Sequence, residues 1–249
     1  MKVAVYGAMG RMGQLLSDHL VEHGHDVIQV DPQRQQEAVF ASLEVAPKSD
    51  VIIDFSHPSW CETVLTYALN THTPLVIACT GHNDAQFKRI EEASQALAIF
   101  KSANLSVGVY VFEQMLKAYT HLLEETYDIE IHETHHKHKV DAPSGTAWLL
   151  ANAIEEGSQA PKTFITDRAH QPTLRQNHEV GLSVHRGGSV VGEHTVAFYG
   201  DADTLKITHQ AHTKNLFVQG ALLAASYLKS QAPGLYTMHD MMEERRKTL

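Results

Sequence analysis

Titratable and positively charged side chains crowd into one short segment, EIHETHHKHKVDAPSGTA, which spans 130–147. It contains four histidines and two lysines, namely His132, His135, His136, Lys137, His138 and Lys139. Histidine titrates near neutral pH, so it can hand a proton to a bound molecule. Lysine supplies a full positive charge that attracts carboxylates. The segment therefore predicts acid catalysis on a small anionic substrate.

A helix is expected to begin within this segment. Pro143 disfavours helical backbone in the residue before it, and Ser144 is a favoured N-cap for a helix over 147–155. The N–H groups of Gly145 and Thr146 would then be available to an anion at the helix N-terminus. With a lysine and a histidine beside them, they suit one carboxylate or two.

Two other interpretations of the histidine cluster are open. Closely spaced histidines could hold zinc, but the interleaved Lys137 and Lys139 oppose a cation, so we expect no metal here. The cluster could also be a solvated strand end in a chain with 18 histidines. Further along, Arg186 and Gly187-Gly188 could face the site or form a hairpin, and the hairpin is favoured. Glu193 and His194 are expected to be ordinary residues of a sheet face.

A glycine-rich turn, GAMGRMG over 7–13, follows a short apolar run and opens a helical pattern. Glycine lets a pyrophosphate sit against main-chain N–H groups at a helix N-terminus. Asp31 stands eighteen residues after Gly13, at the end of the next apolar run, where an acid would bond ribose hydroxyls. The match to G-x-G-x-x-G is imperfect, because Ala8 occupies its first position. The pattern predicts a dinucleotide site, with a ligand-free turn as the alternative.

The cofactor could be NADH or NADPH. The Asp31 carboxylate would repel a 2′-phosphate, which favours NADH. Arg34 follows closely enough to reach such a phosphate, which favours NADPH. The sequence leaves both open.

The first half of the chain alternates buried apolar runs with helical patterns, which is typical of a parallel sheet covered on both faces. Strands are expected at 2–7, 26–30, 51–55, 75–79 and 98–101, and helices at 11–20, 59–70 (capped by Ser59) and 84–97. Later runs are separated by short turns, which predicts a mixed sheet. Its strands are expected at 128–133, 181–186, 189–199 and 204–211, with a loop over 165–177 that holds Pro172 and a helix over 215–229.

Composition excludes several classes. The chain has 249 residues, no apolar run of about 18 residues that would cross a membrane, and a net charge of −9, opposite to that of a nucleic-acid binder. Its two cysteines, Cys61 and Cys79, make no metal spacing, and the N-terminus shows no secretory pattern. We expect a reduced, cytoplasmic protein without nucleic-acid or membrane partners.

The 130–147 segment resembles the signature of the 4-hydroxy-tetrahydrodipicolinate (dihydrodipicolinate) reductase family. The resemblance extends over most of the chain and includes GAMGRMG at 7–13, VIIDFSHP at 51–58, ACTG at 78–81, SANLSVGV at 102–109, RGGSVVGEHTV at 186–196 and the helix after Lys214. Many members carry an aromatic residue where Leu105 stands, and some carry arginine where Lys214 stands.

The resemblance implies a role for each matching position. His135 matches a proton donor, and Lys139 matches a second proton donor that also holds substrate. The implied substrate-binding residues are His136, Ser144, Gly145 and Thr146. The implied cofactor-binding residues are Gly7, Ala8, Met9, Gly10, Arg11, Met12 and Asp31 on the phosphate and ribose side, and Ala78, Cys79, Thr80, Ser102, Ala103, Asn104 and Leu105 on the nicotinamide side.

The implied reaction is hydride transfer from NADH or NADPH to a cyclic dicarboxylate, 4-hydroxy-tetrahydrodipicolinate, in lysine and diaminopimelate biosynthesis. The implied fold is α/β, with a doubly wound, Rossmann-like nucleotide domain over 1–106 and 214–249. An α+β mixed-sheet domain over 107–213 would bind substrate and form a homotetramer. Two alternatives are a dehydrogenase of another small carboxylate and a nucleotide-sensing protein without turnover.

Overall fold

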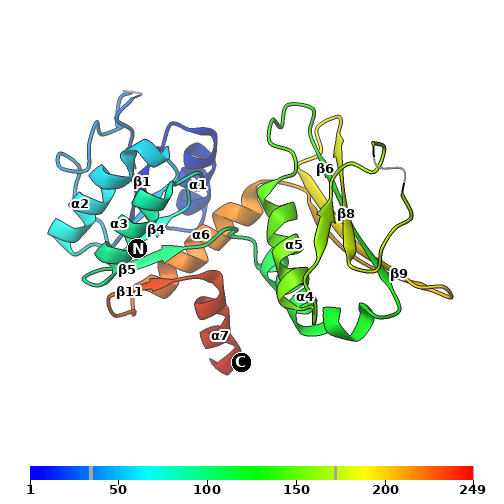
Figure 1. The fold of residues 1–249 in the computed structure, drawn as a ribbon. Helices are drawn as coiled ribbons and strands as arrows, with labels where there is room; N and C mark the ends of the chain where they lie inside the picture. The colour runs from blue at the N-terminus through cyan, green and yellow to red at the C-terminus, as the bar shows by residue number, and fades with distance from the viewer. Residues whose placement is uncertain (34–35, 171–172, 249) are drawn as a thin grey trace. The chain divides into compact units, whose positions relative to one another are not determined.

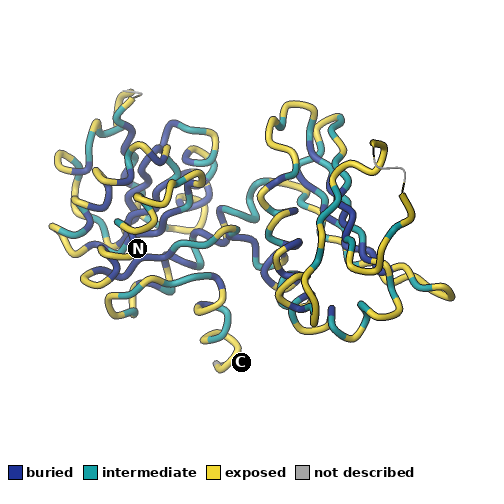
Figure 2. The backbone as a smooth tube through the Cα atoms, in the orientation of Figure 1, coloured by how far each residue is buried: buried dark blue, intermediate teal, exposed yellow. Residues whose placement is uncertain are grey.

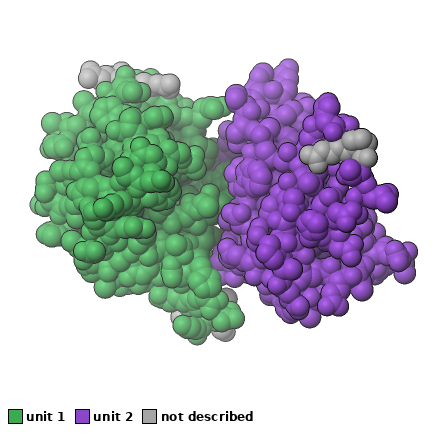
Figure 3. All heavy atoms as spheres, in the orientation of Figure 1, with its two compact units in different colours: residues 1–106, 215–249 green, residues 107–214 purple. Residues whose placement is uncertain are grey.

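The computed structural model of the chain describes residues 1–33, 36–170 and 173–248 (Figure 1). The chain divides into two compact units, residues 1–106 with 215–249 (unit 1) and residues 107–214 (unit 2) (Figure 3). Each unit has its own sheet and its own hydrophobic core. Within these described ranges, no helix has the length and apolarity that crossing a bilayer requires.

Unit 1 is built on six parallel strands in the order β11-β5-β4-β3-β1-β2. Their bounds are β1 Lys2–Tyr6, β2 Asp26–Val30, β3 Val51–Asp54, β4 Leu75–Ile77, β5 Ala98–Lys101 and β11 Gly234–Tyr236. The central strands β3 and β4 are buried at every residue (Figure 2). Because the strand order reverses at β1, ligands of such sheets bind beside its carboxyl end. The predicted doubly wound sheet is confirmed.

Helices cover both faces of this sheet. α1 (Arg11–Glu22) packs with α6 (Asn215–Leu228), and α2 (Cys61–Thr71) packs with α3 (Asp84–Ser94). The final helix is α7, Met238–Thr248. The prediction that Ser59 caps the second helix is wrong, because Ser59 lies in a short 3₁₀ turn, η1 (Pro58–Trp60), and α2 begins only at Cys61.

Unit 2 is built on a five-stranded mixed sheet in the order β10-β9-β6-β8-β7. The strands are β6 Asp128–His135, β7 Thr163–Ile165, β8 Glu179–Arg186, β9 Gly192–Tyr199 and β10 Thr204–Ala211. β6 pairs in parallel with β8 and antiparallel with β9. The predicted hairpin at Gly187-Gly188 is therefore wrong, because β6 lies between the two strands that this turn connects. The turn instead crosses the end of β6, where the Gly187 N–H donates to the His135 carbonyl at 2.9 Å.

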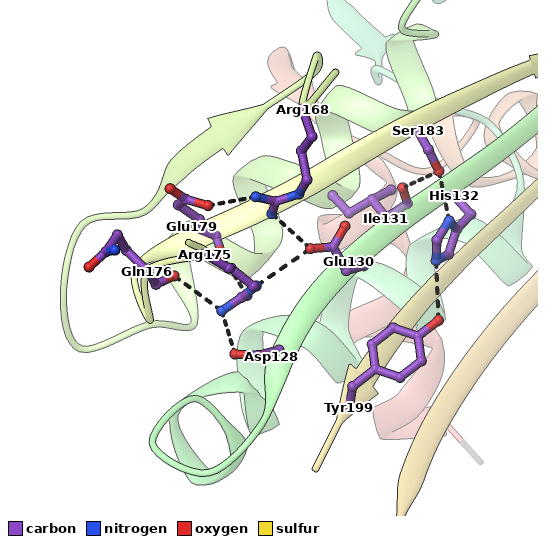
Figure 4. Close-up of polar contacts among 10 residues, drawn as sticks. All are labelled: Asp128, Glu130, Ile131, His132, Arg168, Arg175, Gln176, Glu179, Ser183 and Tyr199. Atoms are coloured by element: carbon purple, nitrogen blue, oxygen red, sulfur yellow. Dashed lines mark hydrogen bonds and ion pairs between the residues drawn. The ribbon is translucent and has the colours of Figure 1, made fainter. Parts of the chain in front are cut away.

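Two helices, α4 (Val107–Leu123) and α5 (Gly145–Glu156), pack on one face of this sheet. Successive strand residues point to opposite faces, so Ile129 and Ile131 enter this core while Glu130 lies on the other face. On that face Arg168 donates to both Glu130 (3.0 Å) and Glu179 (2.7 Å) (Figure 4). This contact ties part of the polar loop after β7 to the sheet; Pro172 of that predicted loop lies outside the described residues.

Candidate active site

The glycine turn of unit 1 joins β1 to α1, as predicted. Gly7 has a φ of +79°, and a Cβ there would lie 2.8 Å from the Ser56 backbone. A Cβ on Gly13 would lie 2.2 Å from the Gly7 carbonyl oxygen. Only glycine fits at these two positions, the first because of the tight turn and the second because α1 approaches β1 so closely.

A pocket of about 190 Å³ lies beside this turn. Its lining consists of Gly7, Gly10, Asp31, Pro32, Gln33, Phe55, Ser56, His57 and Trp60. Among the other predicted phosphate-side residues, Ala8 and Met9 are buried, and Arg11 and Met12 form the first turn of α1. A glycine turn at a helix N-terminus, an acid and a pocket between them fit the phosphate and ribose groups of a dinucleotide.

Asp31 is buried and already bonded to the protein. Its carboxylate accepts a hydrogen bond from the Met9 N–H at 3.0 Å and another from the Gln33 N–H at 3.0 Å. The first of these bonds clamps the glycine turn to the end of β2. Asp31 therefore shapes the turn as well as lining the pocket. Arg34, the residue that would favour NADPH, lies outside the described residues.

The predicted nicotinamide-side segments follow β4 and β5 at the carboxyl edge of the sheet. They meet two residues that the sequence analysis did not single out, Asp54 and Lys101. The Cys79 thiol donates to the Asp54 carboxylate at 3.5 Å, and the Lys101 ammonium donates to the Cys79 carbonyl at 3.3 Å. Burial, followed by the charge of Asp54, raises the pKa of the Cys79 thiol, so this group is not a nucleophilic thiolate.

Leu105, the last residue of the predicted nicotinamide-side loop, packs against α6. It is buried, and its carbonyl oxygen would lie 1.7 Å from a Cβ on Gly220 of α6. Leu105 thus locks the loop after β5 onto α6, whereas Ser102, Ala103 and Asn104 are more exposed. The glycine in α6 is required for this close approach.

In unit 2, the predicted N-cap of α5 is confirmed. The Ser144 hydroxyl accepts a hydrogen bond from the Ala147 N–H at 3.1 Å, and α5 begins at Gly145. Gly145 is exposed and Thr146 is half-buried. The first-turn N–H groups of a helix point along its axis toward its N-terminus, where they attract anions.

The four clustered histidines separate in the structure. His135 is buried on the helix-facing side of β6, and His136 and Lys139 are half-buried just beyond the strand. His138 is exposed. His132 lies on the opposite face, where its ring contacts Ser183 at 2.7 Å and Tyr199 at 3.5 Å (Figure 4). Because side chains alternate between the two faces of β6, His135 lies on the face that packs against α5, and His132 lies on the opposite face, away from the candidate site.

A buried carboxylate, Glu133, organises the surroundings of His135. One oxygen, Oε2, lies 2.8 Å from His135 Nδ1. The other, Oε1, accepts hydrogen bonds from the Ser144 N–H at 2.9 Å and from Arg186 at 3.1 Å. Burial opposes ionisation, but the contacts from His135, Ser144 and Arg186 outweigh it and lower the pKa of Glu133 to about 2.

His194 reaches the same cluster from β9. Its Nε2 shares a 3.0 Å hydrogen bond with the Ser144 hydroxyl and lies 3.8 Å from Glu133. Burial, and then the neighbouring His135, lower the pKa of His194 to about 4, so its ring is neutral at pH 7. The prediction of an ordinary sheet-face residue is wrong for His194.

Lys139 and Arg186 bring positive charge to this cluster. The Lys139 ammonium pairs with Asp141 at 2.8 Å, and Arg186 also donates to the Asp141 carbonyl at 2.6 Å. Burial, then Lys214 and other nearby cations, lower the pKa of His136. Of the two alternatives for Arg186, the less favoured one is found: its side chain faces Glu133, because its strand ends beside His135.

Glu133, His135 and His194 offer donor atoms that lie within 4.8 Å of one another, a spacing compatible with a metal ion. The Arg186 guanidinium at 3.1 Å from Glu133 opposes a cation at this position. One sequence signal could have revealed Glu133 as a site residue. It shares the core-facing side of β6 with Ile129 and Ile131, where a carboxylate needs partners.

The chain was compared with known proteins. Residues 1–105 match the family model described as "Dihydrodipicolinate reductase, N-terminus", and residues 108–242 match "Dihydrodipicolinate reductase, C-terminus". The 4-hydroxy-tetrahydrodipicolinate reductase of Clostridium novyi (strain NT) is 36% identical over 250 residues, which covers 98% of this chain and 99% of that protein. The protein of the same name from Exiguobacterium sp. is 38% identical, with 98% and 96% covered.

A solved structure has the same fold. It is the dipicolinate-bound dihydrodipicolinate reductase from Paenisporosarcina sp. TG-14, with a TM-score of 0.75 and 22% identity over 95% of this chain and 97% of that chain. Both halves of the chain thus match one family, and the full-length relatives carry the corresponding activity in their names. The chain belongs to the dihydrodipicolinate reductase family of oxidoreductases.

Proposed function

We propose that the chain reduces 4-hydroxy-tetrahydrodipicolinate to tetrahydrodipicolinate with NADH or NADPH, and that His135 and Lys139 provide acid catalysis. The observation that carries this proposal is the buried His135 beside the N-terminus of α5, with Lys139 just beyond its strand. The family assignment supplies the substrate, a small cyclic dicarboxylate.

Carboxylate binding follows from the charges near α5. The first-turn N–H groups at Gly145 and Thr146 present partial positive charge, and Lys139 adds a full one. His136 stands close to these cations and has a lowered pKa, so its neutral ring can accept or donate a hydrogen bond. A protein of net charge −9 needs such a local reversal of charge to collect a dianion.

The proposed reaction consumes a proton, which His135 or Lys139 must supply. The nicotinamide, when bound, supplies a hydride to C4 of the substrate ring. The substrate loses its hydroxyl group as water, and one proton is consumed for each hydride transferred. We assign this proton to the His135 ring, with Lys139 as a second donor that also holds a carboxylate.

The units divide the work. Unit 1, with its glycine turn and pocket, would hold the dinucleotide through Gly7 to Met12 and Asp31, and present the nicotinamide near 78–80 and 102–105. Unit 2 would hold the substrate and form a homotetramer through its sheet. Both cysteines are unpaired thiols, which supports a reducing, cytoplasmic location.

The proposal is tested by one steady-state assay. Freshly prepared 4-hydroxy-tetrahydrodipicolinate is added to the full chain with NADH or with NADPH, and loss of absorbance of the reduced nicotinamide is followed. We expect substrate-dependent oxidation, with NADH at least as effective as NADPH because of Asp31. Cofactor binding without oxidation would instead identify a sensor, and turnover of a 2-oxo acid alone would identify another dehydrogenase.

A further inference from the structure

Glu133 is a carboxylate with no exposed surface, on the face of β6 that otherwise packs against α4 and α5. Burying a charge costs several kcal/mol unless partners compensate it. An apolar residue would fill the same space without this loss of free energy, so packing alone does not explain a carboxylate here. The reason is visible in what this carboxylate contacts.

The groups around Glu133 come from separate parts of unit 2. His135 lies two residues along the same strand, Ser144 stands at the start of α5, Arg186 ends β8, and His194 lies in β9. Contacts of 2.8 Å to His135, 2.9 Å to Ser144 and 3.1 Å to Arg186 converge on the two carboxylate oxygens. One side chain thus ties the imidazole to the N-terminus of the helix.

We propose that Glu133 is the positioning residue of this site. Its negative Oε2, at an ion-pair distance of 2.8 Å, favours one ring proton on Nδ1 of His135. In the doubly protonated imidazolium, the second proton is then the one on Nε2, and this proton passes to the substrate and leaves a neutral ring protonated on Nδ1. Glu133 also fixes that ring beside the first turn of α5, where the substrate carboxylate binds. This inference rests on the proposed function only in taking His135 as the proton donor.

The other side of the His135 ring supports this assignment. A Cβ on Gly192 would lie 3.1 Å from His135 Nε2, and that glycine is buried at the start of β9. The missing side chain leaves Nε2 unobstructed on that side. The two nitrogens are therefore treated differently, because Nδ1 faces a carboxylate while Nε2 faces a glycine.

Charge is the property that an amide cannot replace. Glutamine at 133 can keep an oxygen that accepts from the Ser144 N–H and from Arg186, but its NH₂ group, in the place of Oε2, cannot accept a proton from His135 Nδ1. Without a negative oxygen beside Nδ1, the His135 ring would no longer favour the tautomer with its proton on Nδ1. Glu133→Gln therefore separates positioning of the ring from simple filling of space.

Glu124 offers a matched control. It is also an ion-paired glutamate of unit 2, with a side chain only 7% exposed, and it contacts Lys162 at 2.5 Å and the Gln159 N–H at 2.7 Å. It lies at the end of α4 and contacts none of the groups that surround His135. Both Glu133→Gln and Glu124→Gln should lower the melting temperature, whereas only Glu133→Gln should impair chemistry.

The test combines kinetics with a spectroscopic measurement of the ring. We expect Glu133→Gln to lower kcat by about 10²–10³-fold with the KM for NADH within about twofold of wild type, since the proton donor is misplaced and cofactor binding is not. Glu124→Gln should keep kcat within about twofold. Long-range ¹H–¹⁵N correlation of His135 should show a proton on Nδ1 in the wild type and loss of that preference in Glu133→Gln.

Two outcomes would overturn the proposal. One is a wild-type His135 ring whose single proton lies on Nε2, which can be read even if Glu133→Gln does not fold. The other is a folded Glu133→Gln protein with wild-type kcat on an active substrate. Gly192→Ala adds an independent check, because crowding Nε2 should lower kcat while leaving the proton on Nδ1. Absence of any wild-type turnover would count against the proposed function, and the ring measurement would still decide the role of Glu133.

Discussion

His135 gains its chemical character from side chains that share its face of the sheet, not from its immediate neighbours in sequence. Its neighbours in the chain, His136 and Lys137, lie beyond the strand, whereas Glu133 and His194 contact or approach its ring from within the sheet. Burial of these groups removes water that would compete for their hydrogen bonds, so each contact has a larger effect than it would at the surface. Single substitutions of residues should therefore affect proton transfer and cofactor binding separately.

Replacing His135 by glutamine should remove the proton donor. We expect kcat to fall by about 10²–10⁴-fold, as is usual for loss of a general acid, with the Kd for NADH unchanged. Steady-state kinetics and fluorescence titration of NADH measure the two quantities. A variant with nearly wild-type kcat would exclude His135 from proton donation.

Asp31 should influence the choice between cofactors through its charge. Asp31→Asn keeps an acceptor for the Met9 N–H, which holds the glycine turn, but removes the charge that repels a 2′-phosphate. We expect the ratio of the Kd for NADPH to the Kd for NADH to fall about tenfold. Titration of both cofactors measures this ratio, and an unchanged ratio would argue against a ribose contact.

His194 should make the fold less stable in mild acid. Its pKa is lowered to about 4 in the folded chain, whereas an unfolded histidine titrates near 6.5, so the unfolded state binds the proton first as pH falls. The stabilisation is present above pH 6.5 and is lost between pH 6.5 and 4, by an amount on the order of 3 kcal/mol.

His194→Gln checks this pH dependence. Glutamine can still bond the Ser144 hydroxyl, but it does not titrate. Denaturant unfolding at a series of pH values should therefore show a shallower loss of stability for the variant than for the wild type. Parallel curves for the two proteins between pH 6.5 and 4 would show that His194 makes no such contribution.

The position of α1 against β1 depends on glycines, because a side chain at these positions would clash with the neighbouring backbone. Gly7 and Gly13 let β1, the turn and the helix pack at backbone distance, and Asp31 clamps the turn from β2. The same turn lines the pocket. Gly13 packs against the backbone and is not in the pocket lining, whereas Gly10 lines the pocket, so we expect Gly13 to affect mainly stability and Gly10 mainly cofactor binding.

Gly13→Ala and Gly10→Ala should separate these two properties. A Cβ at position 13 would lie 2.2 Å from the Gly7 oxygen, so α1 must move, and we expect a loss of about 3 kcal/mol in unfolding free energy. A Cβ at position 10 would lie 3.2 Å from the same oxygen, and Gly10 lines the pocket in which we propose that the pyrophosphate binds. This variant should stay nearly as stable and bind NADH at least tenfold more weakly. Equal stability of the two variants would contradict this distinction.

At the scale of the whole molecule, the two units carry separate cores and separate parts of the chemistry. Unit 1 presents the pocket in which we propose that a dinucleotide binds, and unit 2 presents His135, the proposed proton donor, and the cations near it. The sheet face of unit 2 opposite α4 and α5 carries polar and charged side chains, among them Glu130, His132 and Tyr199 (Figure 4). We expect this face to join copies of the chain in the proposed tetramer.

An arginine on that face should disrupt the assembly. Thr208 is exposed on β10 and shares a hydrogen bond of 2.9 Å with Thr195 on the neighbouring strand. We expect light scattering after gel filtration to give a tetramer for the wild type and a smaller species for Thr208→Arg. Glu155→Arg, on the exposed side of α5, should remain tetrameric. A wild-type monomer would exclude the proposed assembly.

Local patterns in the sequence were sufficient to predict much of the fold. Continuous apolar runs predicted the strands of the parallel sheet because both faces of that sheet are buried. Serine favours the N-cap position and glycine favours tight turns, and both preferences are local. The start of α5 after Ser144 and the turn after β1 could therefore be predicted. The resemblance to a known family was carried by the same segments.

Strand order and the convergence of distant side chains were decided only by the tertiary structure. The patterns do not predict α4, β7, β11 or α7, and adjacency in sequence wrongly predicted a hairpin after Arg186, because pairing of β6 between β8 and β9 is a long-range event. Glu133, Arg186 and His194 become partners only through that pairing. Sequence determined which groups are present, and tertiary packing determined which of them meet in a dry environment where their charges matter.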